Sequence, residues 1–210
     1  MHPLRRPHPA TALATLLALA CVFWQASAAA ASLGVQVLSS TGQPLEHAAV
    51  FLESREARSA IKPMKGVEVQ QIDKRFDPLV TIVTTGTELH FPNRDKVRHH
   101  VYSFSAPKAF ELKLYTGSPT NPVLFDKPGI VVLGCNIHDR MMAWVVVVDT
   151  PYFGRSGADG QASLRDVPPG SYHLRVWHPE MPPGSAAMDI ALVVPAGALS
   201  TTVRLAGKAA

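Results

Sequence analysis

The chain has 210 residues, which is enough for one large domain or two small ones. Hydrophobic residues make up 47% of it and charged residues 17%, the composition of an ordinary globular protein with enough apolar material for a core. The formal net charge is +4, but Arg5 and Arg6 lie in a segment that we expect to be removed. The remaining 18 basic and 16 acidic residues nearly balance, so charge gives no reason to expect nucleic-acid binding.

The first 30 residues have the pattern of a secretory signal peptide. Two arginines, Arg5 and Arg6, precede an apolar run over residues 10–24, and small residues occupy positions 26–32. The apolar run is short for a membrane span. We therefore expect residues 1–30 to direct export to the periplasm, and we expect no stable membrane span.

Cleavage is expected after Ala28 or Ala30, and it would remove Cys21. Acylation of Cys21, as in a lipoprotein, is disfavoured because Ala18 stands three residues before it, where a large aliphatic residue is usual. Cys135 is then the only cysteine, so no internal disulfide can form. An exposed free thiol is a liability in an oxidising compartment, so we expect this sulfur to be buried or bound.

The rest of the chain consists of short segments rich in β-branched or alternating apolar residues, bounded by glycine, proline or asparagine. The eighteen prolines suit strands and turns better than helices. Residues 46–60 fit a helix about as well as a strand. Strands are expected over residues 33–40, 48–54, 79–91, 99–104, 110–114, 129–134, 143–149, 162–167, 171–178, 188–194 and 200–205. This spacing predicts an all-β sandwich or barrel architecture.

One short loop, GCNIHDRMM at residues 134–142, concentrates metal-binding side chains. It places Cys135, His138 and Met141 at intervals of three residues. Cu(I) favours sulfur ligands and Cu(II) favours nitrogen, and a His₂Cys set with a weak axial methionine serves both states. The loop supplies three of these four ligands. The fourth is expected from a neighbouring strand, where His99 and His100 follow a polar turn.

Other chemistries fit the loop less well. A lone cysteine before a strand is often a buried apolar residue, but the spacing to His138 and Met141 argues against that for Cys135. A catalytic Cys–His pair would need a third orienting group and an oxyanion hole, and the sequence shows neither, so we expect no enzyme. Zinc would accept cysteine and histidine, but a thioether is a poor zinc ligand. His90, His173 and His178 are scattered, and we expect them on the surface or in strands.

Residues 65–149 resemble the cupredoxins, and amicyanin-like members most closely. Asn93-Arg94, His99 and Val101 match the segment that carries the first histidine ligand in that family, and the C-x₂-H-x₂-M loop matches the rest of the site. The resemblance implies a Greek-key β-sandwich that holds one type 1 copper ion.

The same resemblance assigns the ligands as His99, Cys135, His138 and Met141. It favours His99 over His100 and Met141 over Met142. It also implies that His138 is the exposed edge through which electrons leave. The sequence departs from the family at His100, where asparagine is common. Two further residues are expected to support the thiolate: Asn93 through its side chain and Asn136 through its backbone N–H.

The flanking segments resemble a different family. Residues 34–52 look like the opening of a transthyretin-like, carboxypeptidase-regulatory-like sandwich, and residues 157–179 look like its closing segment. This resemblance implies that residues 31–60 and 150–210 are the N-terminal and C-terminal strands of one small sandwich, with the cupredoxin segment inserted in it or flanked by it. The combination is similar to bacterial periplasmic proteins of the "methylamine utilization protein" type, although such a likeness does not fix a partner.

The resulting prediction is a periplasmic blue-copper protein that carries single electrons between redox partners, such as a c-type cytochrome or a periplasmic dehydrogenase. Two alternatives remain open. One is a copper protein for storage, delivery or sensing, and the other is a β-sandwich module that binds a carbohydrate or a protein. The sequence does not predict the oligomeric state.

Overall fold

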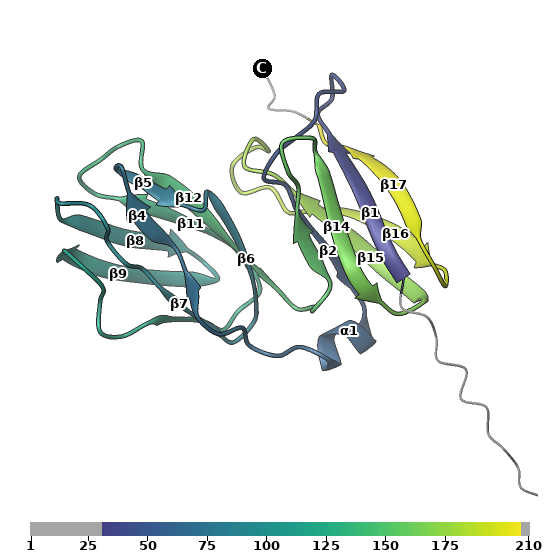
Figure 1. The fold of residues 1–210 in the computed structure, drawn as a ribbon, viewed down its shortest axis with the longest axis horizontal. Helices are drawn as coiled ribbons and strands as arrows, with labels where there is room; N and C mark the ends of the chain where they lie inside the picture. The colour runs from purple at the N-terminus through teal and green to yellow at the C-terminus, as the bar shows by residue number, and fades with distance from the viewer. Residues whose placement is uncertain (1–30, 207–210) are drawn as a thin grey trace, which may run out of the picture.

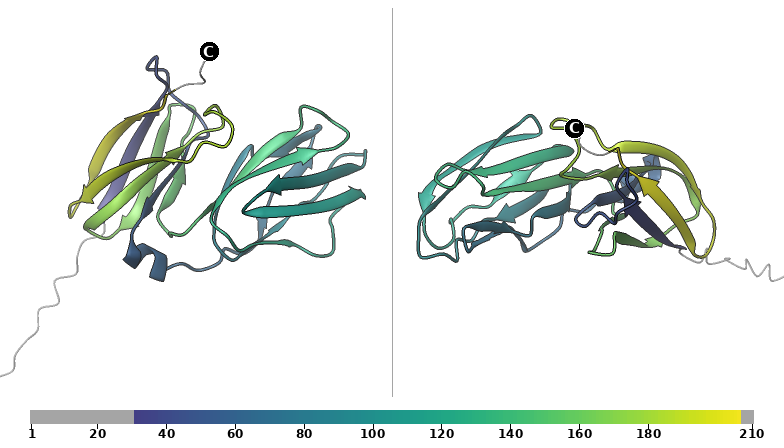
Figure 2. Two further views of the ribbon diagram at one scale, coloured as in Figure 1. Left: turned by 180° about the vertical axis from the view of Figure 1, so that it is seen from behind. Right: turned by 90° about the horizontal axis from the view of Figure 1, so that it is seen from above.

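The computed structural model describes residues 31–206, and within them the protein is all-β, as predicted. It has seventeen strands and one helix of five residues in this range, and the strands form two sandwiches side by side (Figures 1 and 2). The expected signal peptide, with Cys21, lies outside the described residues. None of the helices described is long and apolar enough to cross a membrane.

The first sandwich is built from strands at both ends of the described chain. Its three-stranded sheet has the order β14-β1-β17, and its four-stranded sheet has the order β13-β2-β15-β16. The first strand pairs antiparallel with β14 and parallel with β17. The bounds are β1 Ala31–Leu38, β2 Ala49–Glu53, β13 Phe153–Arg155, β14 Gln161–Val167, β15 Gly170–Trp177, β16 Met188–Val194 and β17 Leu199–Arg204.

The second sandwich is formed by the chain between β2 and β13. A five-stranded sheet of order β6-β12-β11-β8-β9 faces a three-stranded sheet of order β10-β7-β3, and β4 and β5 form a separate hairpin. The bounds are β3 Val67–Glu68, β4 Gln70–Ile72, β5 Arg75–Asp77, β6 Val80–Thr84, β7 Thr87–His90, β8 His99–Ser105, β9 Lys108–Tyr115, β10 Val123–Phe125, β11 Gly129–Cys135 and β12 Met142–Val148.

Two expected elements take a different form. The ambiguous segment 46–60 divides into strand β2 and the short helix α1, Arg55–Ser59, which begins where the Ser54 hydroxyl accepts a hydrogen bond from the Ala57 N–H. The strand expected over residues 79–91 is broken into β6 and β7 by a turn. Gly86 lies in that turn with a φ of 87°, a left-handed conformation that favours glycine.

Strand β12 explains how the two sandwiches meet. Its inward residues Ala143, Val145 and Val147 pack in the core of the second sandwich. Its other face turns Val146 and Val148 into a separate apolar cluster shared with the first sandwich. The run of four valines is therefore buried on both faces, which is why it does not alternate with polar residues. That shared cluster comprises Ala49, Phe51, Val80, Ile82, Val146, Val148 and Trp177.

The sheets therefore group the strands before residue 54 and after residue 152 in one sandwich, and residues 67–148 in the other. The domain boundaries at residues 31–60, 65–149 and 150–210 stay a prediction, and so does the transthyretin-like character of the first sandwich.

Candidate metal centre

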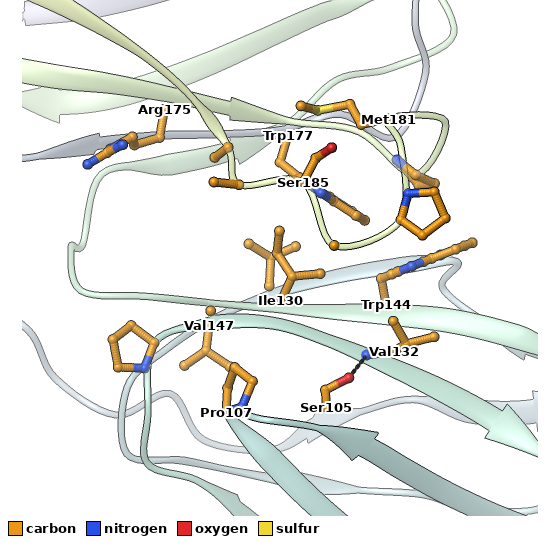
Figure 3. Close-up of a pocket in the computed structure, with 18 of the residues that line it drawn as sticks. Ser105, Pro107, Ile130, Val132, Trp144, Val147, Arg175, Trp177, Met181 and Ser185 are labelled. Carbon is orange, nitrogen blue, oxygen red and sulfur yellow. Dashed lines mark hydrogen bonds between the residues drawn. The ribbon is translucent and has the colours of Figure 1, made fainter. Parts of the chain in front are cut away.

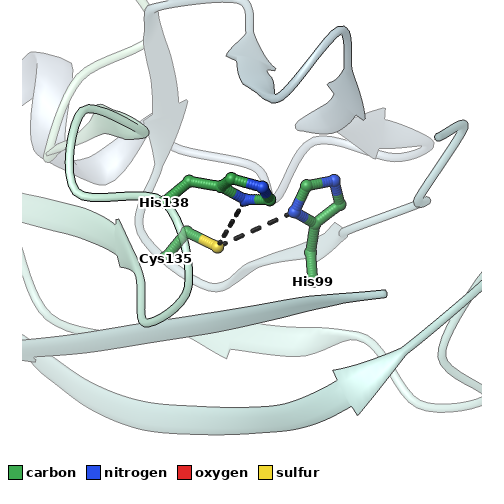
Figure 4. Close-up of side chains that lie close together, drawn as sticks. All are labelled: His99, Cys135 and His138. Carbon is green, nitrogen blue, oxygen red and sulfur yellow. Dashed lines mark hydrogen bonds between the residues drawn. The ribbon is translucent and has the colours of Figure 1, made fainter. Parts of the chain in front are cut away.

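Strand pairing brings distant metal-binding side chains to one end of the second sandwich. His99 is the first residue of β8 and Cys135 is the last residue of β11. These strands pair antiparallel, with Cys135 opposite Val101, so the start of one strand meets the end of the other. His138 lies in the loop that follows Cys135, and Figure 4 shows the three side chains pointing toward one another.

The three side chains place one sulfur and two nitrogens in a compact group. The Cys135 Sγ lies 3.7 Å from the His99 Nδ1 and 3.7 Å from the His138 Nδ1. All three donor atoms lie within 4.8 Å of one another. Cys135 and His99 are buried, while His138 is half-buried, so one side of the group is closer to solvent than the other.

The spacing of these donors fits a transition-metal ion. A metal about 2.0–2.1 Å from each nitrogen and about 2.3 Å from the sulfur, in trigonal or tetrahedral geometry, would separate the sulfur from each nitrogen by roughly 3.6–3.8 Å. The observed separations of 3.7 Å agree with this range. One thiol and two imidazoles are also a donor set that copper accepts. The residues present can therefore hold a copper ion.

His99 is oriented by Asp95, which the sequence analysis did not single out. The His99 Nε2 lies 2.8 Å from the Asp95 Oδ2, and this contact leaves the Nδ1 to face Cys135. The imidazole is completely buried, and a carboxylate on the outer nitrogen of a ligand histidine fixes both its ring orientation and its tautomer. A search for an acidic residue four positions before the histidine would have found this contact.

Asp95 is itself held by a tight turn between β4 and β5. Asp73 and Lys74 both have positive φ values, 52° and 59°, and their backbone N–H groups donate to the two Asp95 carboxylate oxygens at 2.8 and 2.9 Å. Burial alone would raise the pKa of Asp95, but hydrogen bonds from Lys74, His99 and Asp73 outweigh it and lower that pKa. The carboxyl group therefore stays ionised beside the histidine.

The loop after Cys135 is a closed turn. The Met141 N–H donates to the His138 carbonyl at 2.9 Å, and the Cys135 N–H donates to the Met141 carbonyl at 3.2 Å. Met141 is 2% exposed and packs in the same core as Cys135, whereas Met142 is 44% exposed. Met141 is therefore a buried residue of the same core as Cys135, and its role as a ligand stays a prediction.

His100 points away from the group because neighbouring residues of a strand face opposite sides. Its Nε2 lies 2.9 Å from the Glu111 Oε1, and its ring packs edge-on against Tyr102. His99, and not His100, therefore shares the group with Cys135 and His138.

The two asparagines that we expected to support the thiolate, Asn93 and Asn136, make their hydrogen bonds with other groups. The Asn93 amide donates to the Val97 and Tyr115 carbonyls at 2.8 and 2.9 Å, and its oxygen accepts from the Asp95 N–H. The Asn136 N–H donates to the His100 carbonyl at 3.3 Å. Neither donates to the Cys135 sulfur, so this expectation is wrong. Asn93 instead shapes the turn that places Asp95.

A buried tyrosine lies next to His99. Tyr115 pairs with His99 across β8 and β9, and its hydroxyl donates to the Phe91 carbonyl at 2.7 Å. Burial raises the pKa of Tyr115 to about 12, in spite of a hydrogen bond from Gln71, and the nearby Cys135 charge adds to the increase. The phenol is therefore neutral, and it is a hydrogen-bonding support for this end of the core.

The other histidines are distributed as follows. His90 ends strand β7, and His173 is exposed on β15 with its Nδ1 2.8 Å from the Asp189 Oδ1. His178 differs from expectation, because it lies just after β15 and is only 6% exposed. Its ring nitrogens contact the Glu46 carbonyl and the Glu180 N–H, so its burial has a structural reason.

No protein-family model matches the chain, and no curated protein matches its sequence. Among solved structures, a purple cupredoxin from Nitrosopumilus maritimus is similar at 18% identity, over 39% of this chain and 99% of that one, with a TM-score of 0.35. A copper-containing nitrite reductase from Thermus scotoductus is 26% identical over 42% of this chain and 23% of its own, with a TM-score of 0.38. A Cu(I) structure of an amicyanin variant is 17% identical over 47% of this chain and 98% of its own, with a TM-score of 0.36. At these TM-scores the likenesses are too weak to assign a function, which has to come from the geometry of the site.

Proposed function

We propose that this chain is a cupredoxin-type blue-copper protein that carries single electrons in the periplasm and is not an enzyme. His99, Cys135 and His138 would be the strong ligands, and Met141 would be the weak axial ligand. The observation that carries the proposal is the convergence of one sulfur and two Nδ1 atoms, each nitrogen 3.7 Å from the sulfur, with His99 36 residues before Cys135 in the chain.

The protein holds the donor side chains in position without a bound metal ion. Asp95 fixes the His99 ring, and β11 fixes the Cys135 backbone at the edge of the core. Copper, when bound there, would supply a one-electron couple. Donors that keep their positions when the charge of the site changes reduce the reorganisation that accompanies electron transfer. The rigid donor set therefore suits a carrier.

The two histidines would have different tasks. His99 is completely buried and is tied to Asp95, so it positions the site. His138 is half-buried in the loop, next to Ile137, which is 47% exposed. A partly exposed ring next to an apolar surface residue offers a partner the shortest route to the site. We infer that electrons enter or leave by His138, from a partner such as a c-type cytochrome or a periplasmic dehydrogenase.

Burial of the donors disfavours storage or delivery. A protein that hands its metal to another must let the acceptor reach the ligands. Here the His99 side chain is 0% exposed and Cys135 is 5% exposed, so an acceptor would have to displace the loop first.

The signal-peptide pattern of residues 1–30 supports the periplasmic location, and the patterns of residues 34–52 and 157–179 support a transthyretin-like first sandwich.

The test is a visible absorption spectrum of the purified protein during titration with Cu(II), followed by ascorbate. An intense thiolate-to-copper charge-transfer band that bleaches on reduction is the expected result. Cys135→Ser should abolish the band, and the matched control Met142→Leu should barely shift it. A colourless protein that binds one copper ion would favour storage or delivery. A protein that binds none would make Cys135 a packing residue.

A further inference from the structure

A cavity of about 830 Å³ lies where the two sandwiches meet (Figure 3). One wall is the outer face of β11 and β12, with Ile130, Val132 and Trp144. The opposite wall is formed by β15 and by residues 178–187, a segment with three prolines that follows Trp177. The volume is within the range of small-molecule sites, about 300–1,000 Å³, which often lie between domains.

Tryptophans from the two sandwiches meet in this cavity. Trp144 from β12 and Trp177 from β15 have ring centroids 6.2 Å apart and an interplanar angle of 54°. Ile130 of β11 and Val146 of β12, which pair across the sheet, add aliphatic surface beside them, and Pro107 also lines the cavity (Figure 3). Rings and flat aliphatic surfaces on both sides favour a planar, apolar molecule between them.

The cavity also has one polar region, around Arg175. The Arg175 Nε donates to the Glu53 Oε2 at 3.0 Å, and its Nη1 donates to the Asp189 Oδ2 at 3.1 Å. Glu53 and Asp189 carry two negative charges against the one positive charge of Arg175, so these three side chains have a net negative charge that disfavours an anionic ligand. The guanidinium has five N–H groups and the carboxylates have further lone pairs, so a neutral carbonyl or hydroxyl could still be bound.

The strands that line the cavity offer no free edge to a peptide. Strand β11 lies between β8 and β12, β12 lies between β11 and β6, and β15 lies between β2 and β16. The backbone groups of β12 and β15 are paired on both sides. The cavity-lining part of β11 pairs with β12 but not with β8, and the Val132 N–H there donates to the Ser105 hydroxyl, so few backbone groups are left for an added peptide strand. The cavity therefore suits a small molecule that is recognised by side chains.

We propose that this cavity binds a neutral planar aromatic molecule that carries carbonyl or hydroxyl oxygens, of the quinone and quinol class. The rings would pack between Trp144 and the 178–187 segment, and an oxygen would face Arg175. Met142, which follows Met141 in the chain, also lines the cavity. This site is additional to the proposed copper function and does not depend on it.

The test is calorimetric titration of the copper-free full chain, carrying Cys135→Ser so that this free thiol cannot add to the quinone, with 1,4-naphthoquinone and with 2-naphthoate as the anionic probe. We expect 1,4-naphthoquinone to bind and 2-naphthoate to bind at least about tenfold more weakly. Two of the three tryptophans of the chain line the cavity, so binding should also quench the intrinsic fluorescence.

Three variants locate the binding. Ile130→Phe narrows the cavity beside the tryptophans, and Ala186→Trp adds bulk at an exposed residue that lines it, so a folding defect in the first leaves the second as a test. Each should weaken binding at least about tenfold, and Arg175→Met should weaken it by about the same factor through the lost hydrogen bond. The control Leu124→Phe changes an exposed residue of β10 outside the cavity and should have no effect.

Absence of binding up to the solubility limit of 1,4-naphthoquinone would overturn the proposal. So would binding that both cavity variants leave unchanged, since the probe would then sit elsewhere. Tighter binding of 2-naphthoate, or binding only of a proline-rich peptide, would refute the ligand class. Because the titration uses copper-free protein, none of these results depends on whether the metal centre turns blue.

Discussion

The two sandwiches fill their interiors differently. Beside its apolar cluster, which includes Leu33, Leu164 and Leu174, the first sandwich buries few polar side chains, His178 among them. The second sandwich buries more polar side chains, including Gln71, Asn93 and His99. Burying polar groups is costly unless they are hydrogen-bonded, so their presence needs a reason other than stability.

This difference in buried polar side chains indicates where a functional site lies. In β1, buried and more exposed residues alternate without exception, and every inward position is apolar. At the end of the second sandwich, inward positions carry an imidazole and a thiol, with a carboxylate behind the imidazole. A sequence that breaks the packing rule at one place in an otherwise regular fold usually does so at a site.

The largest expected effect is metal-dependent stabilisation of the second sandwich alone. Copper at a thousandfold excess over its dissociation constant should add about 4 kcal/mol to the free energy of unfolding. Hydrogen exchange followed by mass spectrometry should show new protection in β8 and β11 but little change in β1 and β14.

Two neighbouring variants make that prediction specific. His99→Ala should remove the protection, because it deletes a donor atom of the group. His100→Ala should keep it, because that ring points to Glu111 on the other face of β8. The reverse result would transfer the first ligand to His100.

A core truncation in the first sandwich gives the next largest effect. Leu164 is completely buried in the apolar cluster, so Leu164→Ala should cost about 2–5 kcal/mol of the free energy of unfolding, measured by denaturant titration. The visible spectrum of the folded, copper-loaded variant should stay unchanged. Arg165→Ala, on the exposed face of the same strand, is the control and should cost little. A shifted spectrum in Leu164→Ala would show that the two interiors are coupled.

Asp95→Asn tests the support behind the buried histidine. The amide cannot act as an ionised acceptor for the His99 Nε2–H, so copper affinity should fall by about 10- to 100-fold in competition with a chelator. Glu111→Gln removes the charge from the matching contact of His100 and should leave the affinity unchanged. Equal losses in both variants would mean that general surface charge, and not orientation of His99, sets the affinity.

Local patterns in the sequence predicted much of this molecule. The all-β class followed from short β-branched runs and punctuating glycines and prolines, and the loop from Cys135 to Met141 was visible from its spacing. Strands of two or three residues, such as β3 and β13, were not predicted, because so few residues cannot show an alternation of apolar and polar side chains.

The role of Asp95 and the hydrogen bonds of the two asparagines were not predicted, for a different reason. The Asp95 carboxylate is recognised by the Asp73–Lys74 turn, 21 and 22 residues earlier, and by His99. Asn93 is recognised by carbonyls of Val97 and Tyr115. The contacts with Asp73, Lys74 and Tyr115 depend on how distant segments lie in space, and no sequence period encodes them. The contacts from Asp95 to His99 and from Asn93 to Val97 each span four residues, so a search at that spacing could have found them. His178 was misjudged in the same way, since its burial depends on Glu46, 132 residues away.

His178 gives the smallest and most local prediction, a pH dependence that belongs to the first sandwich. Burial disfavours the charged imidazole and lowers the pKa of His178, although the Glu46 carbonyl and the Glu180 charge oppose this and His47 adds to it. The unfolded chain, with an ordinary pKa of about 6.5, then takes up the proton more readily than the folded one. The stability that His178 contributes should be fully present above about pH 6.5 and should be lost as the pH falls through that value toward the lower folded pKa.

The measurement is the difference in the free energy of unfolding between the metal-free wild type and His178→Gln, taken from about pH 8 to about pH 5. Glutamine can still donate to the Glu46 carbonyl but does not titrate, so the variant should lose less stability on acidification. His173→Gln is the matched control, because His173 is exposed on the same strand and should leave the pH dependence nearly as it is. If His178→Gln followed the wild-type curve, the acid sensitivity would come from groups other than His178, and burial of this imidazole would contribute nothing to the pH response of the first sandwich.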